Sequence, residues 1–192
     1  EIGVNEMNAA HLLYTFDHVK DIVFCFLEIL KIVIPDIVDD DLCCFLFERE
    51  GYYISKNEKT YFKNGFHLHF PKIFLPRSQL EHVVIPKVKE KMDITMIDLP
   101  MGLDVFTILD ECLYRGKGKP WYMYGSTKPE ATAPYACTKM FYANGTFTVD
   151  WKDYLKREFP FVKDLDQSIV EFFSIRTFGK EMYFREIHQN IQ

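Results

Sequence analysis

The sequence predicts an α/β or α+β fold in which a mixed sheet is flanked by helices. Between Val19 and Ile34, apolar residues recur at three- and four-residue spacing, which places them on one face of a helix. The apolar runs Leu42–Phe47 and Phe66–Phe70 are typical of strands. Strand-like and helix-like segments interleave along the chain, so we expect residues 1–192 to form a single domain.

The first helix is expected to begin after Thr15, whose side chain can cap it, and to end at Pro35. The run Leu42–Phe47 is apolar throughout, so both faces of this strand should be covered. Cys43 and Cys44 would then face opposite sides of the sheet.

Further along, Gly51–Asn64 alternates aromatic with polar residues and predicts a hairpin or mobile connection. A second helix is expected over Ser78–Met92, limited or restarted by Pro86. Asn144-Gly145 favours a type I′ hairpin turn, and Asp164–Phe173 fits a closing helix.

Composition narrows the classes of function. A chain of 192 residues with 48% hydrophobic residues can bury a core without disulfide or metal staples. Its net charge of −5 argues against a protein that coats nucleic acid non-specifically, so any such contact must be local. Five cysteines without a Cys-x-x-Cys favour a reducing compartment and a protein that is not secreted. No apolar run approaches the roughly 20 residues that cross a bilayer, so no membrane partner is expected.

The first candidate for chemistry is a histidine that follows a flexible turn. His67 and His69 would share one face of their strand. A hydrogen-bonded core residue is the usual fate of such a histidine. Gly65 favours the other interpretation, because a residue without a Cβ lets a ligand approach, and His67 could then contact a phosphate. The two histidines could also bind zinc, but no third ligand at suitable spacing is evident.

Downstream residues offer a carboxylate and a second phosphate contact. Asp110 is a candidate ligand for a hard divalent ion such as Mg²⁺ or Mn²⁺, with a helix cap or surface residue as the alternative. Gly125, Ser126 and Lys128 lie in a polar run whose backbone, hydroxyl and ammonium groups could hold phosphate oxygens. The run lacks the residue order of a Walker loop, so ATP-driven helicase activity is not encoded in this piece.

Nucleic-acid contacts have two candidates. Arg115, Lys117 and Lys119 are separated by glycines and form the best local basic cluster, although on charge alone a solvated surface loop is the more frequent explanation. Tyr124 belongs to an alternating aromatic run that could stack on a base or simply pack against a sheet.

Three ordered motifs carry a family resemblance. Gly65-Phe66-His67, Leu109-Asp110 and Trp121–Lys128 resemble the second, third and nucleotide-contacting motifs of archaeo-eukaryotic primases. The likeness is greatest to the amino-terminal domains of the primase-helicases of nucleocytoplasmic large DNA viruses. The helix Leu13–Leu30 and the late Ser174-Ile175-Arg176 also resemble that family.

The chain departs from this family in its first motif. These primases carry an Asp-x-Asp strand whose carboxylates hold the catalytic metals, and the strand should precede the helix that begins near Thr15. Nothing before Thr15 fits it, so we expect the chain to be a fragment of a longer primase-helicase. Asp39-Asp40-Asp41 contains an Asp-x-Asp, but this triplet follows the helix and is a poor substitute.

The resemblance implies an archaeo-eukaryotic primase-like core that makes primers by template-directed nucleotidyl transfer. Asp110 and His67 would be catalytic, Asp110 would hold Mg²⁺ or Mn²⁺ with upstream carboxylates, and His67, Gly125, Ser126 and Lys128 would bind nucleotide. The implied partners are nucleoside triphosphates, a single-stranded DNA template and a helicase domain of the same protein, with a homo-hexamer formed through the parent. The expected location is the viral replication site in the host cytoplasm, or the host nucleus.

Two other readings remain open at this point. The first is a catalytically inactive nucleotide- or nucleic-acid-binding module of a replication protein. The second is a structural domain whose motifs are accidental. A thermal shift with nucleoside triphosphate separates the structural reading from the others.

Overall fold

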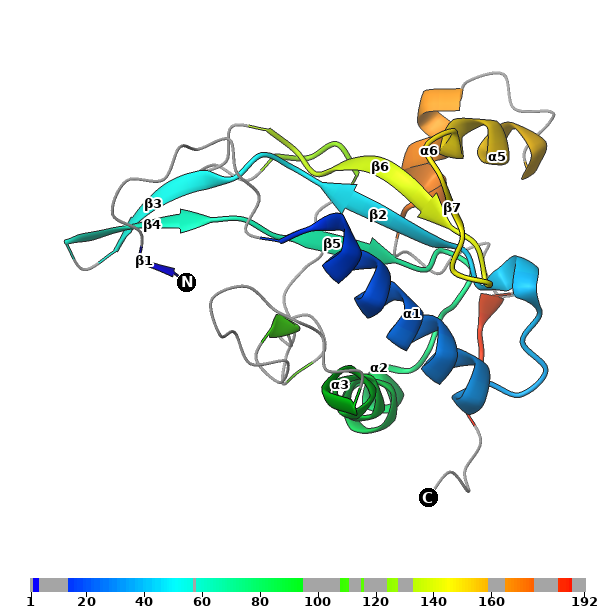
Figure 1. Ribbon diagram of the computed structural model, residues 1–192. Helices are drawn as coiled ribbons and strands as arrows, with labels where there is room; N and C mark the ends of the chain where they lie inside the picture. Colours follow the sequence, from blue (N-terminus) through cyan, green and yellow to red (C-terminus); the bar gives the residue numbers. More distant parts are fainter. Residues whose placement is uncertain are drawn as a thin grey trace.

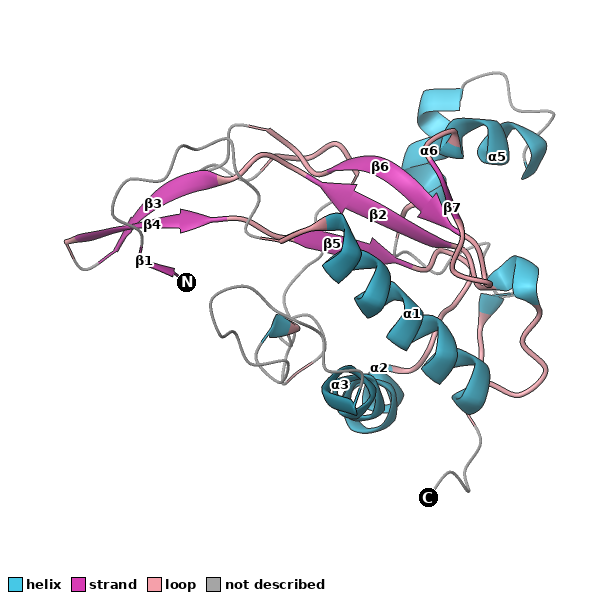
Figure 2. Ribbon diagram, viewed as in Figure 1, coloured by secondary structure: helices cyan, strands magenta, loops and turns pink. Residues whose placement is uncertain are grey.

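The computed structural model describes residues 2–3, 14–56, 58–94, 108–110, 115, 124–127, 133–158, 165–174 and 183–187. Within these residues the fold is α+β, as predicted: a four-stranded antiparallel sheet carries helices on both faces (Figures 1 and 2). Its strands, in the order β5-β2-β6-β7, are β5 (Phe66–His69), β2 (Cys44–Glu48), β6 (Ala136–Phe141) and β7 (Phe147–Thr148).

A second antiparallel sheet has the order β1-β4-β3, formed by β1 (Ile2–Gly3), β4 (Lys59–Lys63) and β3 (Tyr52–Lys56). The hairpin predicted for this part of the chain is therefore confirmed. Figure 1 shows β3 and β4 extending away from the helices as a two-stranded arm. Along the chain, the two strands of the arm come between β2 and β5.

Helix α1 (Phe16–Val33) begins and ends where the sequence predicts. The Thr15 hydroxyl accepts a hydrogen bond from the His18 backbone N–H at 3.2 Å, and His18 Nδ1 accepts one from the Thr15 N–H at 3.0 Å. This reciprocal cap satisfies two backbone donors at the start of the helix. Pro35 follows the last turn and cannot continue the helix.

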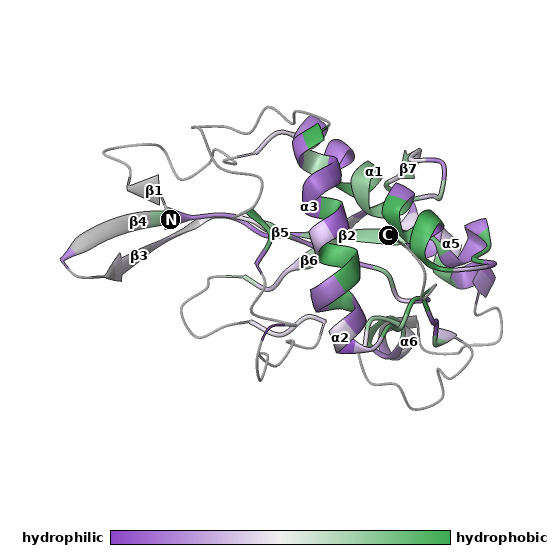
Figure 3. Ribbon diagram, turned by 90° about the horizontal axis from the view of Figure 1, so that it is seen from below, coloured by the Kyte–Doolittle hydropathy of each residue, from purple (hydrophilic) through white to green (hydrophobic). Residues whose placement is uncertain are grey.

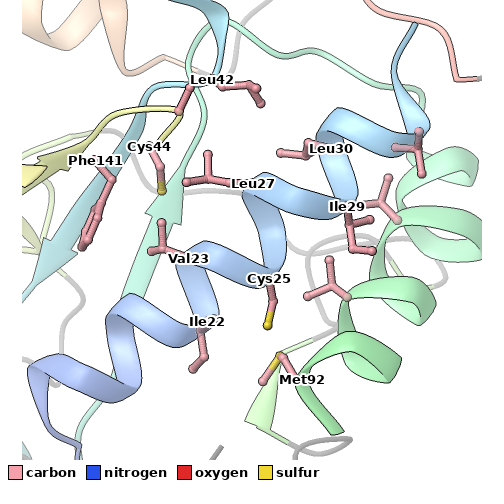
Figure 4. Packing of buried hydrophobic residues seen from close by; sticks show 14 of the residues in the cluster. Ile22, Val23, Cys25, Leu27, Ile29, Leu30, Leu42, Cys44, Met92 and Phe141 are labelled. Atoms are coloured by element: carbon pink, nitrogen blue, oxygen red, sulfur yellow. The ribbon is translucent and has the colours of Figure 1, made fainter. Parts of the chain in front are cut away.

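The first core cluster lies between α1, α3 (Ile85–Ile94) and one face of β2. Figure 4 shows the apolar face of α1 directed at Cys44 of β2, Phe141 of β6 and Met92 of α3. Figure 3 shows that α3 also carries polar residues, as expected of a helix with one exposed face. No helix in the described part of the chain is both long and apolar enough to cross a membrane.

The second core cluster covers the opposite face of the same sheet. Phe45 and Phe47 of β2 pack there with Trp151 and Leu155 of α5 (Trp151–Glu158) and with α6 (Leu165–Phe172). Cys43 belongs to this second cluster and Cys44 to the first, so the prediction that they face opposite sides is confirmed. Both faces of β2 are covered, which explains its continuous apolar sequence.

The helical segment containing Pro86 is longer than the sequence predicts. It runs from α2 (Arg77–Gln79) through a π-helical turn, η2 (Leu80–Val84), into α3 without interruption. Proline has no N–H to donate to the preceding turn, and the wider π turn just before Pro86 accommodates that missing bond.

The hairpin between β6 and β7 is confirmed, but its turn is not type I′. A type I′ turn needs positive φ at both central residues. Gly145 has φ of 80°, whereas Asn144 is absent from the described non-glycine residues with positive φ. The Gly145 N–H donates to the Tyr142 carbonyl at 2.9 Å, so the loop is a three-residue connection closed by a left-handed glycine.

Candidate functional site

His67 lies on β5 opposite Phe47 of β2, on the sheet face away from α1. Its ring stacks on that of Tyr135, with centroids 3.8 Å apart and planes 26° apart. The side chain is partly exposed, so His67 is not a fully buried core residue. In Figure 1, α5 and α6 lie toward the far end of the sheet from the arm, whereas His67 belongs to the start of β5, next to the arm.

The residues just before His67 border open space. A Cβ added to Gly65 would meet no atom within 4 Å in the described structure, and Gly65 has no positive φ that demands glycine. Asn64 has its side-chain Nδ2 and Oδ1 buried without a hydrogen-bond partner among the described residues. A buried amide of this kind is costly unless it acquires a partner. This region can therefore receive a polar ligand without displacing described side chains.

His69 shares the face of His67 but lies deeper. Its ring centroid is 5.9 Å from those of Phe47 and Phe173. Among the described residues no three His, Cys, Asp or Glu side chains are grouped so that they could hold a metal ion. The neighbouring thiols do not help, because burial raises the pKa of Cys43 to about 11 and keeps it neutral.

Asp110 is exposed. The two residues before it are packed against one side of the sheet. Ile108 and Leu109 pack against the first core cluster, on the α1 side. His67 lies on β5, on the face of the sheet away from α1. The joint catalytic role of Asp110 and His67 stays a prediction.

The polar run around Gly125 reaches the His67 side through Tyr124. The Tyr124 ring lies 5.5 Å from Phe47 and 5.1 Å from Phe173, and its hydroxyl accepts a hydrogen bond from the Cys137 N–H at 3.4 Å. Tyr124 therefore packs against the sheet, the second of its two predicted roles. Gly125, with φ of 80°, and Ser126 follow it and are exposed.

Among the basic candidates, the structure describes Arg115, whose side chain is exposed. Lys117, Lys119 and Lys128 lie outside the described residues, and their roles stay predictions.

Glu48 is the carboxylate that ends β2, and sequence reasoning did not single it out. It accepts hydrogen bonds from the Tyr14 hydroxyl at 3.2 Å and the Thr138 hydroxyl at 2.5 Å, and Lys139 Nζ lies 3.4 Å away. Because strand residues alternate, Glu48 points to the α1 side, away from His67. Its carboxylate oxygens are thus engaged by two hydroxyl groups and one ammonium group.

The triplet Asp39–Asp41 forms a short 3₁₀ helix at the other end of β2. Asp41 pairs with Arg185 at 2.6 Å and Asp39 with Lys31 at 3.2 Å. These ion pairs, and the distance of one whole strand from the His67 end, argue against the triplet as a substitute metal site. The described residues by themselves therefore do not make a complete site for a divalent ion.

Two residues beside His67 escaped sequence reasoning. Tyr135 precedes β6, and Arg49 follows β2 with its guanidinium carbon 4.3 Å from the centre of the Tyr135 ring. Arg49 and Tyr135 lie two residues from Phe47 and Cys137, respectively. This spacing predicts that they lie beside His67 only when the pairing of β2 with β5 and β6 is known. Phe47 lies opposite both His67 and Cys137, and residues two positions away share that face.

Comparison with known proteins connects this chain to a family. Residues 2–141 match the family described as the C962R protein N-terminal AEP domain, where AEP denotes archaeo-eukaryotic primase. A protein named as helicase 121R, from Invertebrate iridescent virus 3, is 31% identical over 152 residues. A second, named as helicase 184R, from Invertebrate iridescent virus 6, is 29% identical over 109 residues.

These matches cover 75% and 54% of this chain, but only 16% and 11% of the two viral proteins. No solved structure matches the chain significantly. The family match extends over most of the chain and includes β2, β5 and β6, which carry the His67 face. The chain thus belongs to the family of C962R-type amino-terminal archaeo-eukaryotic primase domains.

Proposed function

We propose that this chain is the nucleotide-binding part of a primase that makes primers on single-stranded DNA during viral DNA replication. The observation that carries the proposal is the position of Gly65-Phe66-His67 within a primase-family domain. His67 is partly exposed there, and Gly65 borders open space that can admit a phosphate. An imidazole at this position would hold the triphosphate of the incoming nucleotide by a charge-assisted hydrogen bond.

The proposal assigns the remaining contacts to residues of the same chain and its parent. Ser126 and Lys128 would hold phosphate oxygens beside Gly125, and Asp110 would supply one carboxylate to Mg²⁺ or Mn²⁺. When bound, such an ion stabilises the negative charge that develops during phosphoryl transfer. The other carboxylates would come from residues beyond the described ones, because the described residues contain no complete set.

The wider setting is also part of the proposal. Relatives named as helicases are several times longer than the matched segment, which supports a parent protein that also contains a helicase domain. Assembly of that parent into a hexamer, and its action in the host cytoplasm or nucleus, extend the same proposal.

A pair of substitutions tests the phosphate role of His67. His67→Ala should weaken the affinity for a nucleoside triphosphate about tenfold or more, because a hydrogen bond to a charged group is lost. Gly65→Ala should do the same by placing a methyl group where the ligand approaches, although it meets nothing in the protein itself. Affinity is measured by titration with a fluorescent ATP analogue.

The unliganded melting temperature is the control for both variants. Gly65→Ala is expected to leave it unchanged, since neither space nor φ requires glycine there. Unchanged nucleotide affinity in both variants would exclude this face as the triphosphate site.

A specific observation favours a second candidate function. On the His67 face the His67 ring stacks on Tyr135, and the Arg49 guanidinium lies over the same ring. A ring and a cation side by side suit the binding of a base and its phosphate. A nucleotide- or nucleic-acid-binding module of a replication protein is therefore the alternative, and it predicts nucleotide affinity without incorporation in the parent protein.

A further inference from the structure

Three planar groups form a column on the His67 face. The His67 ring lies over one face of Tyr135 at 3.8 Å, and the Arg49 guanidinium carbon lies 4.3 Å from the centre of the same ring. Two groups this close to one ring centre would collide if they shared a face. Tyr135 is therefore held between His67 and Arg49.

The column is built by three separate elements that meet at one end of the sheet. His67 is on β5, Arg49 directly follows β2, and Tyr135 directly precedes β6. All three side chains are partly exposed, unlike the phenylalanines of the second core cluster behind them. The column thus lies at the margin of the core, where a ligand can reach it.

The chemistry of the column suits a nucleobase with its phosphate. Guanidinium planes and aromatic rings both stack on bases, and the N–H groups at the edge of a guanidinium donate to phosphate oxygens. A cation–π contact with the Tyr135 ring positions the Arg49 guanidinium before any ligand binds.

The surroundings support the same use. Gly65 borders open space beside His67, and the buried amide of Asn64 has no described partner. Lys63 is exposed at the end of the β4 strand of the arm, one residue before Asn64. In a chain with a net charge of −5, this local pairing of cations with rings is a favourable place for an anionic, base-containing ligand.

We infer that Arg49, oriented by Tyr135, binds a nucleobase and its adjoining phosphate beside His67. The ligand is either the incoming nucleotide or a nucleotide of the single-stranded template, since both offer the same base and phosphate. The inference rests on the proposed function only in taking the His67 face as the surface that meets nucleotides. It adds Arg49 as a binding residue and Tyr135 as a positioning residue.

The test is binding of two probes to this chain without divalent metal. One probe is a fluorescein-labelled oligothymidylate, and the other is a fluorescent ATP analogue. Arg49→Lys keeps the positive charge but removes the plane, and it should weaken at least one probe about tenfold. Tyr135→Phe keeps the ring and should bind normally, whereas Tyr135→Ala should behave like Arg49→Lys.

Arg157→Ala is the matched control, because it removes an exposed arginine from α5, which packs at the other end of the sheet. It should bind both probes as the wild type does. Melting temperatures show whether Tyr135→Ala is folded, and Arg49→Lys carries the conclusion if it is not.

Loss confined to the oligonucleotide places the template on the column, and loss confined to the ATP analogue places the incoming nucleotide there. Unchanged binding of both probes by Arg49→Lys, or no binding by the wild type, would overturn the inference. Because no catalysis is measured, a parent protein that synthesises primers would leave the proposed function standing even then. Conversely, if the parent makes no primers, the proposed function fails, but a positive binding result still supports the role of Arg49.

Discussion

Replacing Asp110 with alanine is expected to abolish nucleotide incorporation by the longer parent protein that we propose for this chain. Losing one carboxylate ligand removes several kcal/mol of charge stabilisation in phosphoryl transfer, which corresponds to a rate loss of about a thousandfold or more. Asp110 is exposed, so the variant should fold normally. Incorporation is followed with labelled nucleotide on single-stranded DNA in the presence of Mn²⁺.

Asp93→Ala provides the matched control, because Asp93 is also an exposed aspartate and lies on α3. It should incorporate nucleotide at the wild-type rate. If Asp110→Ala also keeps that rate, Asp110 is not a metal ligand, and the resemblance of Leu109-Asp110 to the third primase motif has no catalytic meaning.

The largest loss of stability is expected for Phe45→Ala. Phe45 is fully buried in β2, and its ring centroid lies 5.5 Å from that of Phe172 and 5.0 Å from that of Phe173. Truncating a buried phenylalanine costs about 3–5 kcal/mol, from lost burial and from the cavity that remains. The free energy of unfolding in urea should fall by this amount, which is a large part of the stability of a domain.

Phe24→Ala on α1 is the control for this prediction, since Phe24 is 46% exposed. Its loss should change the free energy of unfolding far less. Equal losses in the two variants would mean that the second core cluster does not anchor α6 to the sheet as described.

Local signals made much of the fold predictable. Helix α1 is determined by residues close in sequence, namely the cap at Thr15, the apolar period and the stop at Pro35. Strand β2 is readable because burial on both faces requires an unbroken apolar run. Helix α5 was not predicted, because it is short and only Trp151 and Leu155 bury their side chains.

The site was less accessible to sequence reasoning, because it depends on strand register. The motifs indicated His67, and the structure places it on an accessible face. Arg49 and Tyr135 lie beside His67 because Phe47 is paired with both His67 and Cys137. No local sequence pattern encodes this pairing of strands. The metal-binding carboxylates stay a prediction, because no three His, Cys, Asp or Glu side chains among the described residues are grouped so that they could hold a metal ion.

A primase-family domain with His67 at its nucleotide face should belong to an active primase. Primer synthesis by the purified parent protein, with single-stranded DNA, labelled nucleotides and Mn²⁺, tests this. Short labelled products that require the template are expected, and they should be lost when His67 is replaced by alanine. Absence of product from a parent protein that still binds nucleotide and single-stranded DNA would contradict the claim and favour a binding module that has lost catalysis.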